Sequence, residues 1–127
     1  MEIAAFWGEI MSILSDVKKD IGDSSDSTEF DETLIRYINT VFGILAQLGS
    51  GPEKGFKITG YEEEWEDFFV FAGFEDRDDL NMIKTYVQNK VKFMFDNPPN
   101  ASYANAIKEI NNELEWRINA AVDFQED

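Results

Sequence analysis

The amino-acid sequence predicts an all-α fold: four to five helices in a small helical bundle with a long C-terminal α-hairpin. Apolar residues recur every three or four positions over most of the chain, which is the spacing of amphipathic helices. Pro and Gly lie mostly in two short stretches between these periodic segments, as expected of loops. The chain has 127 residues, of which 43% are hydrophobic, and this is enough for one packed core. We therefore expect a single helical domain over residues 1–127.

A first helix is expected over residues 11–21, and the glycine and polar residues of segment 22–27 end it. Its apolar residues at helical spacing are Ile13, Leu14, Val17 and Ile21. The same rhythm continues upstream through Ile3, Phe6, Trp7 and Ile10. The helix could therefore begin earlier, although Gly8 weakens this interpretation.

A second helix over residues 32–48 has the most regular pattern in the chain. Its apolar stripe consists of Leu34, Ile35, Ile38, Val41, Phe42, Leu45 and Leu48. Asp31 suits the N-cap position and Glu32 suits the first turn. Gly49 stands where a left-handed C-cap residue belongs.

A loop over residues 50–60 follows, and within it the alternating segment 56–58 could be extended. Residues 61–71 combine acidic and aromatic side chains, which favours a short helix with a bulky inner face. Ala72 and Gly73 end it. The acidic run 62–67 is either a solvated helix face or a docking surface for a basic partner.

Two long helices complete the chain, over residues 78–95 and 101–122, and the Pro-Pro turn at 98–99 joins them as an α-hairpin. The first has an apolar stripe of Leu80, Ile83, Val87, Val91 and Met94, with Tyr86, Lys90 and Phe93 to its side. Asn100 suits the N-cap of the second. The second helix has near-heptad spacing at Tyr103, Ile107, Ile110, Leu114, Ile118 and Ala121. We expect the tail 124–127 to be frayed.

Composition argues against most catalytic chemistry. The chain has no Cys and no His, so a disulfide scaffold, a thiolate metal site and the usual catalytic triads are excluded. Segment 20–31 lacks the central Gly and closing Glu of a calcium loop. Glu109 and Glu113 lie one turn apart, but a di-metal bundle would need His partners. We predict no catalytic, cofactor-binding or metal-binding residues; a carboxylate-only enzyme is a remote third interpretation.

The formal net charge of −15 would repel a phosphate backbone and an anionic membrane surface. It fits a protein that binds other proteins, or one that lines a passage through which nucleic acid slides. There is no basic segment of a signal peptide and no run of about 20 apolar residues. We therefore expect the protein to be made and kept in a cytoplasm.

Exposed aromatic residues are the best candidates for a binding site. At 100° per residue, Trp116 points well away from the apolar stripe of its helix. Either it contacts a partner, as tryptophan often does at interfaces, or the first helix or the segment around Trp65 covers it. Arg117 could form an interface pair with Trp116 or be an ordinary surface residue. Similar aromatic candidates near the termini are Phe6, Trp7 and Phe124.

The order and spacing of several segments resemble the small head–tail connector proteins of tailed phages and prophages of Gram-positive bacteria, also called adaptor or head-completion proteins. The resemblance covers residues 11–122. The matching segments are Tyr37–Phe42, Leu45–Gly49, Gly51-Pro52, Gly55-Phe56, Trp65–Phe68, Ile83–Val87, Lys90–Lys92, Phe95–Pro99 and Glu113–Asn119. Each is mostly core pattern and turn chemistry, so the ordered set carries the resemblance.

The resemblance implies a non-enzymatic virion protein that forms a ring, dodecameric in the virion, below the portal. It implies three partners: other copies of the chain, the portal protein, and a tail-side connector or stopper protein. DNA would pass through the channel without specific binding, and no membrane or cofactor would be involved. The protein would then be in the host cytoplasm during assembly and at the head–tail interface of the virion afterwards. Similar proteins begin near Met11, so residues 1–10 would be an extension.

Our interface hypothesis combines these interpretations and consists of Trp116, Arg117, Phe124, Gly51, Pro52, Phe56, Phe6 and Trp7. The alternative function is a small acidic helical regulator, monomeric or dimeric, that binds a protein partner and is not part of a virion.

Overall fold

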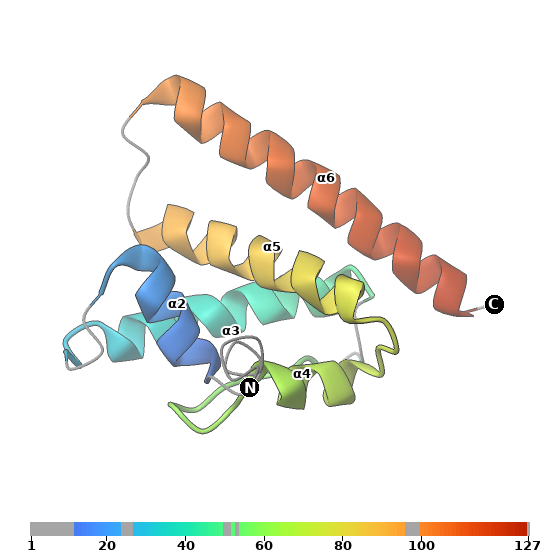
Figure 1. Ribbon diagram of the computed structural model, residues 1–127, viewed down its shortest axis with the longest axis horizontal. Helices are drawn as coiled ribbons and strands as arrows, with labels where there is room; N and C mark the ends of the chain where they lie inside the picture. The colour runs from blue at the N-terminus through green and yellow to red at the C-terminus, as the bar shows by residue number, and fades with distance from the viewer. Residues whose placement is uncertain (1–11, 24–26, 50–51, 53, 96–99, 127) are drawn as a thin grey trace, which may run out of the picture.

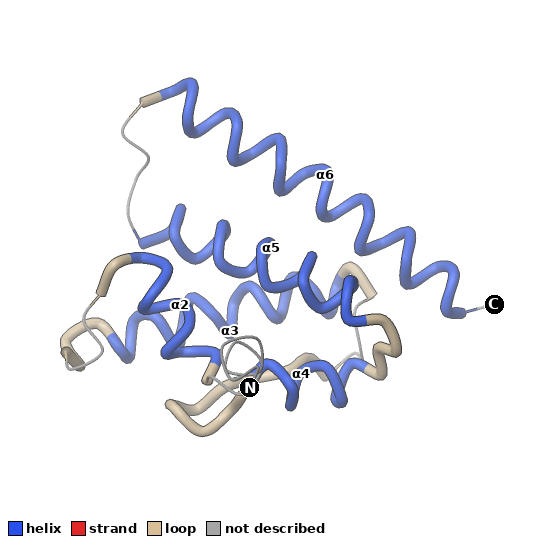
Figure 2. Tube along the Cα trace, viewed as in Figure 1, coloured by secondary structure: helices blue, strands red, loops and turns tan. Residues whose placement is uncertain are grey.

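The computed structural model describes residues 12–23, 27–49, 52, 54–95 and 100–126, and for residues 121–126 it describes only the backbone. These residues contain five helices and no strand, which confirms the predicted all-α fold (Figure 2). The Pro-Pro turn and the upstream segment 1–11 lie outside the described residues, and so does the predicted extension 1–10.

The helices are α2 (Ile13–Ile21), α3 (Asp31–Gln47), α4 (Trp65–Ala72), α5 (Arg77–Phe95) and α6 (Ala101–Glu126). Helix α5 is the central element because it packs against α2, α3 and α6. In Figure 1, α6 lies along one side of the bundle and the short α4 lies at the opposite side. Helix α6 continues past its predicted end at residue 122, and α4 begins later than predicted.

Local capping explains where several helices begin and end. The Ser12 side chain accepts a 3.0 Å hydrogen bond from the amide of Ser15 at the start of α2. Asn100 caps α6 as predicted, since its Oδ1 accepts from the amide of Tyr103 at 2.8 Å. Gly73 ends α4 with a φ of 77°, a conformation that costs glycine little.

The prediction of Asp31 as an N-cap was wrong. Asp31 is the first residue of α3, and the N-cap position is taken by Phe30, which makes no side-chain capping bond. The Asp31 carboxylate instead binds Lys18 of α2 and Tyr61 of the following loop. Burying the Lys18 ammonium without a counter-charge would cost more free energy than leaving the start of α3 without a side-chain cap. Asp31 therefore pairs with Lys18.

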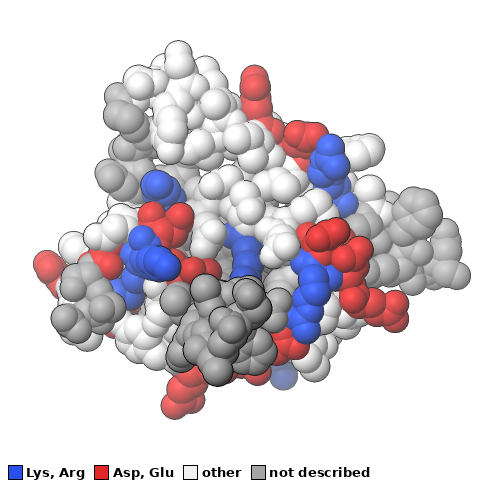
Figure 3. All heavy atoms as spheres, viewed as in Figure 1, with Lys and Arg blue, Asp and Glu red and all other residues white. Residues whose placement is uncertain are grey.

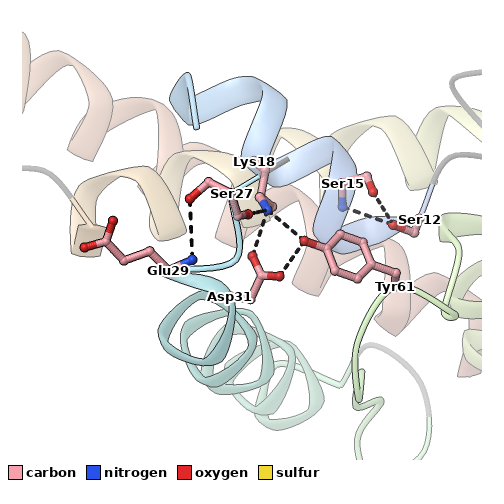
Figure 4. Close-up of polar contacts among 7 residues, drawn as sticks. All are labelled: Ser12, Ser15, Lys18, Ser27, Glu29, Asp31 and Tyr61. Atoms are coloured by element: carbon pink, nitrogen blue, oxygen red, sulfur yellow. Dashed lines mark hydrogen bonds and ion pairs between the residues drawn. The ribbon is translucent and has the colours of Figure 1, made fainter. Parts of the chain in front are cut away.

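Lys18, Asp31 and Tyr61 form a polar cluster that joins α2, α3 and the loop before α4 (Figure 4). The Lys18 ammonium is almost completely buried and donates to Asp31 Oδ1 at 2.8 Å, to the Tyr61 hydroxyl at 2.7 Å and to the Ser27 carbonyl. Burial disfavours its charged form, but these hydrogen bonds outweigh burial, so the pKa of Lys18 is raised. Burial likewise opposes the Asp31 charge, yet Lys18 and Tyr61 lower the pKa of that carboxyl.

The hydrophobic core lies between α2, α3, α4 and α5. Trp65 and Phe42 are fully buried in it, with ring centroids 6.2 Å apart. Segment 56–58, which could be extended on the sequence pattern, belongs to no helix and to no strand among the described residues. The Asn39 side chain holds it instead: Asn39 Oδ1 accepts from the amide of Ile58 at 2.7 Å, and Asn39 Nδ2 donates to its carbonyl at 3.0 Å. The buried core residues are Ile13, Leu14, Val17, Leu34, Ile38, Val41, Phe42, Leu45, Ile58, Trp65, Phe68, Phe69, Phe74, Leu80, Ile83, Tyr86, Val87, Val91 and Ile118.

Two predicted stripes need correction. On α5, Tyr86 is buried although we placed it beside the stripe, and Met94 is exposed although we placed it in the stripe. On α6, Tyr103 and Ile110 are also exposed, while the polar Asn111 is buried. Helix α6 packs chiefly on α5. The Tyr86 hydroxyl is therefore covered by Glu115 of α6, whereas Tyr103 and Ile110 of α6 stay exposed.

Candidate interaction surface

The contact between α5 and α6 combines a few apolar side chains with several polar pairs. Ile118 is the one fully buried apolar side chain on the described part of α6, and Ile107 and Leu114 are half-buried. Asn89 Nδ2 of α5 donates to Asn111 Oδ1 of α6 at 3.1 Å. Such a contact holds α6 in place, but it leaves most of its circumference accessible.

A second polar contact surrounds Glu115 of α6. The Tyr86 hydroxyl donates to Glu115 Oε2 at 2.8 Å, and Lys90 Nζ lies 3.6 Å from the same oxygen. Burial, followed by the bond to Glu115, raises the pKa of the Tyr86 hydroxyl. Tyr86 therefore stays protonated and remains a hydrogen-bond donor to α6 at any pH near neutrality.

A pocket of about 210 Å³ opens between α5 and α6. It has an apolar wall and a polar rim with two lysines, and its lining residues are Lys90, Phe93, Met94, Ile107, Lys108, Asn111 and Asn112. Lys108 Nζ lies 5.6 Å from the centre of the Phe93 ring, a cation–π distance. We call this pocket the α5/α6 groove. The groove could not be predicted from the sequence, because the helical spacing placed Met94 and Ile107 in buried stripes.

Trp116 is 72% exposed, so nothing in the described part of the chain covers it. The alternative that the first helix or the Trp65 segment covers it is therefore wrong, and Trp65 itself is fully buried in the core. Because residues four apart share one helix face, Trp116 continues the row formed by Lys108 and Asn112 at the rim of the groove. Arg117 pairs with Glu113 on the exposed surface at 2.9 Å.

Of the other candidate residues, the structure describes Phe56, Pro52 and the backbone of Phe124. Phe56 is half-buried and packs its ring against Phe42 at 5.3 Å, so most of its contacts belong to the core. Pro52 is exposed on the loop before it. Phe124 lies on the last turns of α6, where only the backbone is described. Three further candidates lie outside the described residues: Phe6, Trp7 and Gly51.

The acidic run 62–67 is used mostly for local structure. Glu64 and Asp67 form a reciprocal capping box at the start of α4. Glu66 pairs with Arg77, and this hydrogen bond lowers the pKa of the Glu66 carboxyl. Glu63 accepts from the Thr59 hydroxyl at 2.8 Å. These contacts favour the interpretation of a structural helix start over that of a docking surface for a basic partner.

Among the described residues, no group of three or more acidic side chains is arranged to hold a metal ion. No helix in that part of the chain is long and apolar enough to cross a membrane. In the view of Figure 3, acidic and basic side chains are interspersed over most of the face, whereas the start of α6 is largely uncharged.

The comparison that decides the family is a match between residues 13–125 and the family model described as phage connector protein. This chain belongs to the phage connector protein family. The match covers α2 to α6, so every helix described above is part of the family's domain. Searches among curated proteins and solved structures gave no significant match.

Membership confirms the resemblance found in the sequence and gives this connector a structural role in a phage. The family is structural and is not known as enzymatic, and it suggests association with other head or tail proteins of the virion.

Proposed function

We propose that this connector is a subunit of a ring that lies below the portal, extends the DNA exit channel and docks the tail. The observation that carries the proposal is the exposed Trp116 on α6, a helix on which only Asn111 and Ile118 are buried among the described side chains. An exposed tryptophan is costly to leave in water and is enriched at interface hot spots. A subunit that is embedded among partners would cover it.

A ring subunit needs two different surfaces, because its neighbours meet head to tail. Helix α6 carries contact residues for these surfaces in this proposal, namely Trp116, Arg117 and the turns with Phe124. The loop with Gly51, Pro52 and Phe56 supplies a further contact, together with Phe6 and Trp7. The ring partners are other copies of the chain, in a dodecamer, and the axial partners are the portal and a tail-side connector or stopper protein.

The charge of the chain supports a position around DNA. With 26 acidic and 11 basic residues, the protein repels a phosphate backbone. A channel wall with this charge lets DNA slide without adhering to it. The repulsion also means that contacts between copies have to be built from specific apolar and charge-paired groups.

The test is the composition of purified phage particles and the effect of deleting the gene. We expect the protein in intact virions in multiple copies, and we expect tail-less heads to accumulate without it. A reconstruction of the virion neck should then place the chain directly below the portal. If intact virions lack the protein, the proposed function is wrong and an intracellular regulator becomes the better explanation.

A further inference from the structure

The α5/α6 groove is smaller than the pockets that hold small molecules, which usually begin at about 300 Å³. Its volume of about 210 Å³ matches one large side chain rather than a cofactor. The wall is apolar, from Phe93, Met94 and Ile107, and the rim carries the cationic Lys90 and Lys108. This combination suits an aromatic side chain that is flanked by carboxylates.

The rim is basic in a chain with a net charge of −15. Lys90 is already shared with Glu115, at 3.6 Å. Lys108 contacts the Phe93 ring, and no carboxylate among the described side chains lies within salt-bridge distance of it. An acidic segment that reaches the groove would therefore meet a positive charge that no described carboxylate neutralises.

The chain itself carries a segment of this chemistry. Residues 123–127 read Asp-Phe-Gln-Glu-Asp, so Phe124 is an aromatic residue among three carboxylates. We propose that the groove of one copy binds this C-terminal segment of a second copy, with Phe124 as the anchor and Lys90 and Lys108 as the charge partners. The inference rests on the proposed ring function and specifies one contact between neighbouring subunits.

The segment cannot reach the groove of its own chain. Helix α6 is continuous from Ala101 to Glu126, and Phe124 is 16 residues beyond Lys108. At a rise of 1.5 Å per residue, these positions are about 24 Å apart along a rigid rod. The anchor and the groove therefore lie at opposite ends of one helix, and their contact has to be between copies.

A contact of this kind is heterologous, since each copy offers a groove at one end and an anchor at the other. Heterologous contacts do not stop at a dimer: they propagate until a ring closes or a filament grows. The row of Lys108, Asn112 and Trp116 would then lie beside the incoming segment, which would also cover the exposed tryptophan.

Disulfide trapping tests the contact directly, because the chain has no native Cys. The full-length Asn112→Cys, Gln125→Cys double variant keeps both Phe124 and Lys108. After mild oxidation we expect a ladder of covalent dimers, trimers and larger species, whereas each single-Cys variant can give dimers at most. A matched control is Asp20→Cys with Gln125→Cys, since Asp20 is exposed on α2 and outside the groove.

Two substitutions in the double-Cys background check the chemistry. Phe124→Ala should slow ladder formation at least about tenfold, and Lys108→Glu should do so by a similar factor, since each removes a contact whose loss is worth about a decade in affinity. The inference is overturned if no ladder forms, if the control pair forms it equally well, or if Phe124→Ala leaves it unchanged. A further outcome is that Lys108→Glu protein is absent from particles although the double-Cys variant forms no ladder. The groove would then bind a segment of another virion protein, and the inference would also be overturned.

The outcomes separate this inference from the proposed function. If the protein enters virions but forms no ladder, the proposed ring function stands and the proposed contact is wrong. If the protein forms the ladder but is absent from virions, the proposed contact stands and the proposed function is wrong.

Discussion

The α2–α5 unit and α6 are held together by different kinds of contact. Helices α2 to α5 share a dense core in which Trp65 and Phe42 are fully buried. Helix α6 is the longest element, yet only Ile118 and Asn111 among its described side chains are buried. Stability therefore belongs mainly to α2–α5, while α6 contributes mainly surface.

The α2–α5 unit and α6 also differ in how their polar side chains are paired. In the α2–α5 unit, the Lys18–Asp31–Tyr61 cluster pairs the buried Lys18 ammonium and joins three segments of the chain. Between α5 and α6, polar pairs such as Asn89–Asn111 accompany the apolar contact of Ile118. A buried ion cluster is costly to break, whereas a partly solvated amide pair contributes little, because water can replace either partner. Single substitutions in the two parts can therefore measure this difference.

The largest effect is expected from Trp65→Ala. Trp65 is fully buried, and its Nε1 donates to Asp16 Oδ2 at 2.8 Å. Its truncation should lower the free energy of unfolding by about 3–5 kcal/mol, through lost burial and the cavity left behind. Urea unfolding followed by circular dichroism measures this. A loss below about 1 kcal/mol would show that the α2–α5 core is not the stable part of the molecule.

A slightly smaller loss, about 3 kcal/mol, is expected from Asp31→Asn, because the buried Lys18 ammonium would lose its counter-charge. The variant should also lose part of its pH dependence. In the wild type the pKa of Asp31 is lower in the folded state than its ordinary 3.8, so the unfolded chain takes up a proton first as the pH falls. Stability from this group is present above pH 3.8 and is lost below it.

The Asp31→Asn variant should lack the part of the stability loss at low pH that comes from protonation of Asp31. Unfolding curves between about pH 2 and 7 compare it with the wild type, with Asp20→Asn, exposed on α2, as the control. Parallel pH profiles for wild type and Asp31→Asn would contradict the assignment of the ion pair.

The contact of α6 is tested by Tyr86→Phe, which keeps the buried ring and removes only the hydroxyl bonded to Glu115. We expect a loss of about 1 kcal/mol, the usual net contribution of one hydrogen bond. Hydrogen exchange should increase more in α6 than in α3, because the bond joins α6 to the rest. Equal increases in both helices would mean that α6 unfolds only together with the core.

Helix positions and caps could be predicted from the sequence because they depend on local spacing. The ranges of α3 and α5 agree with the predictions to within one residue at each end, and Asn100 and Gly73 take the expected capping positions. Long-range choices could not be predicted in this way. Asp31 is not the N-cap of α3, because its carboxylate pairs with the buried Lys18, which is 13 residues earlier in the chain.

The exposed and buried sides of α5 and α6 depend on how these two helices meet, and periodicity alone does not contain that information. Met94 and Ile110 fit the apolar stripes but remain in solvent, whereas Asn111 is buried against Asn89. The α5/α6 groove follows from the same geometry and therefore appears only in three dimensions. Trp116 was the exception, because its position off the stripe was already evident from the 100° rotation per residue.

The smallest effect on stability is expected from Trp116→Ala, which is the counterpart of Trp65→Ala. Since Trp116 is 72% exposed, its truncation should change the free energy of unfolding by no more than about 0.5 kcal/mol. Incorporation into particles should nevertheless fall, because a residue in an interface contributes only once the partner covers it. Quantitative mass spectrometry of particles assembled with each variant provides the readout. A large loss of stability with normal incorporation would make Trp116 a fold residue like Trp65, and the division between a stable α2–α5 unit and a binding α6 would fail.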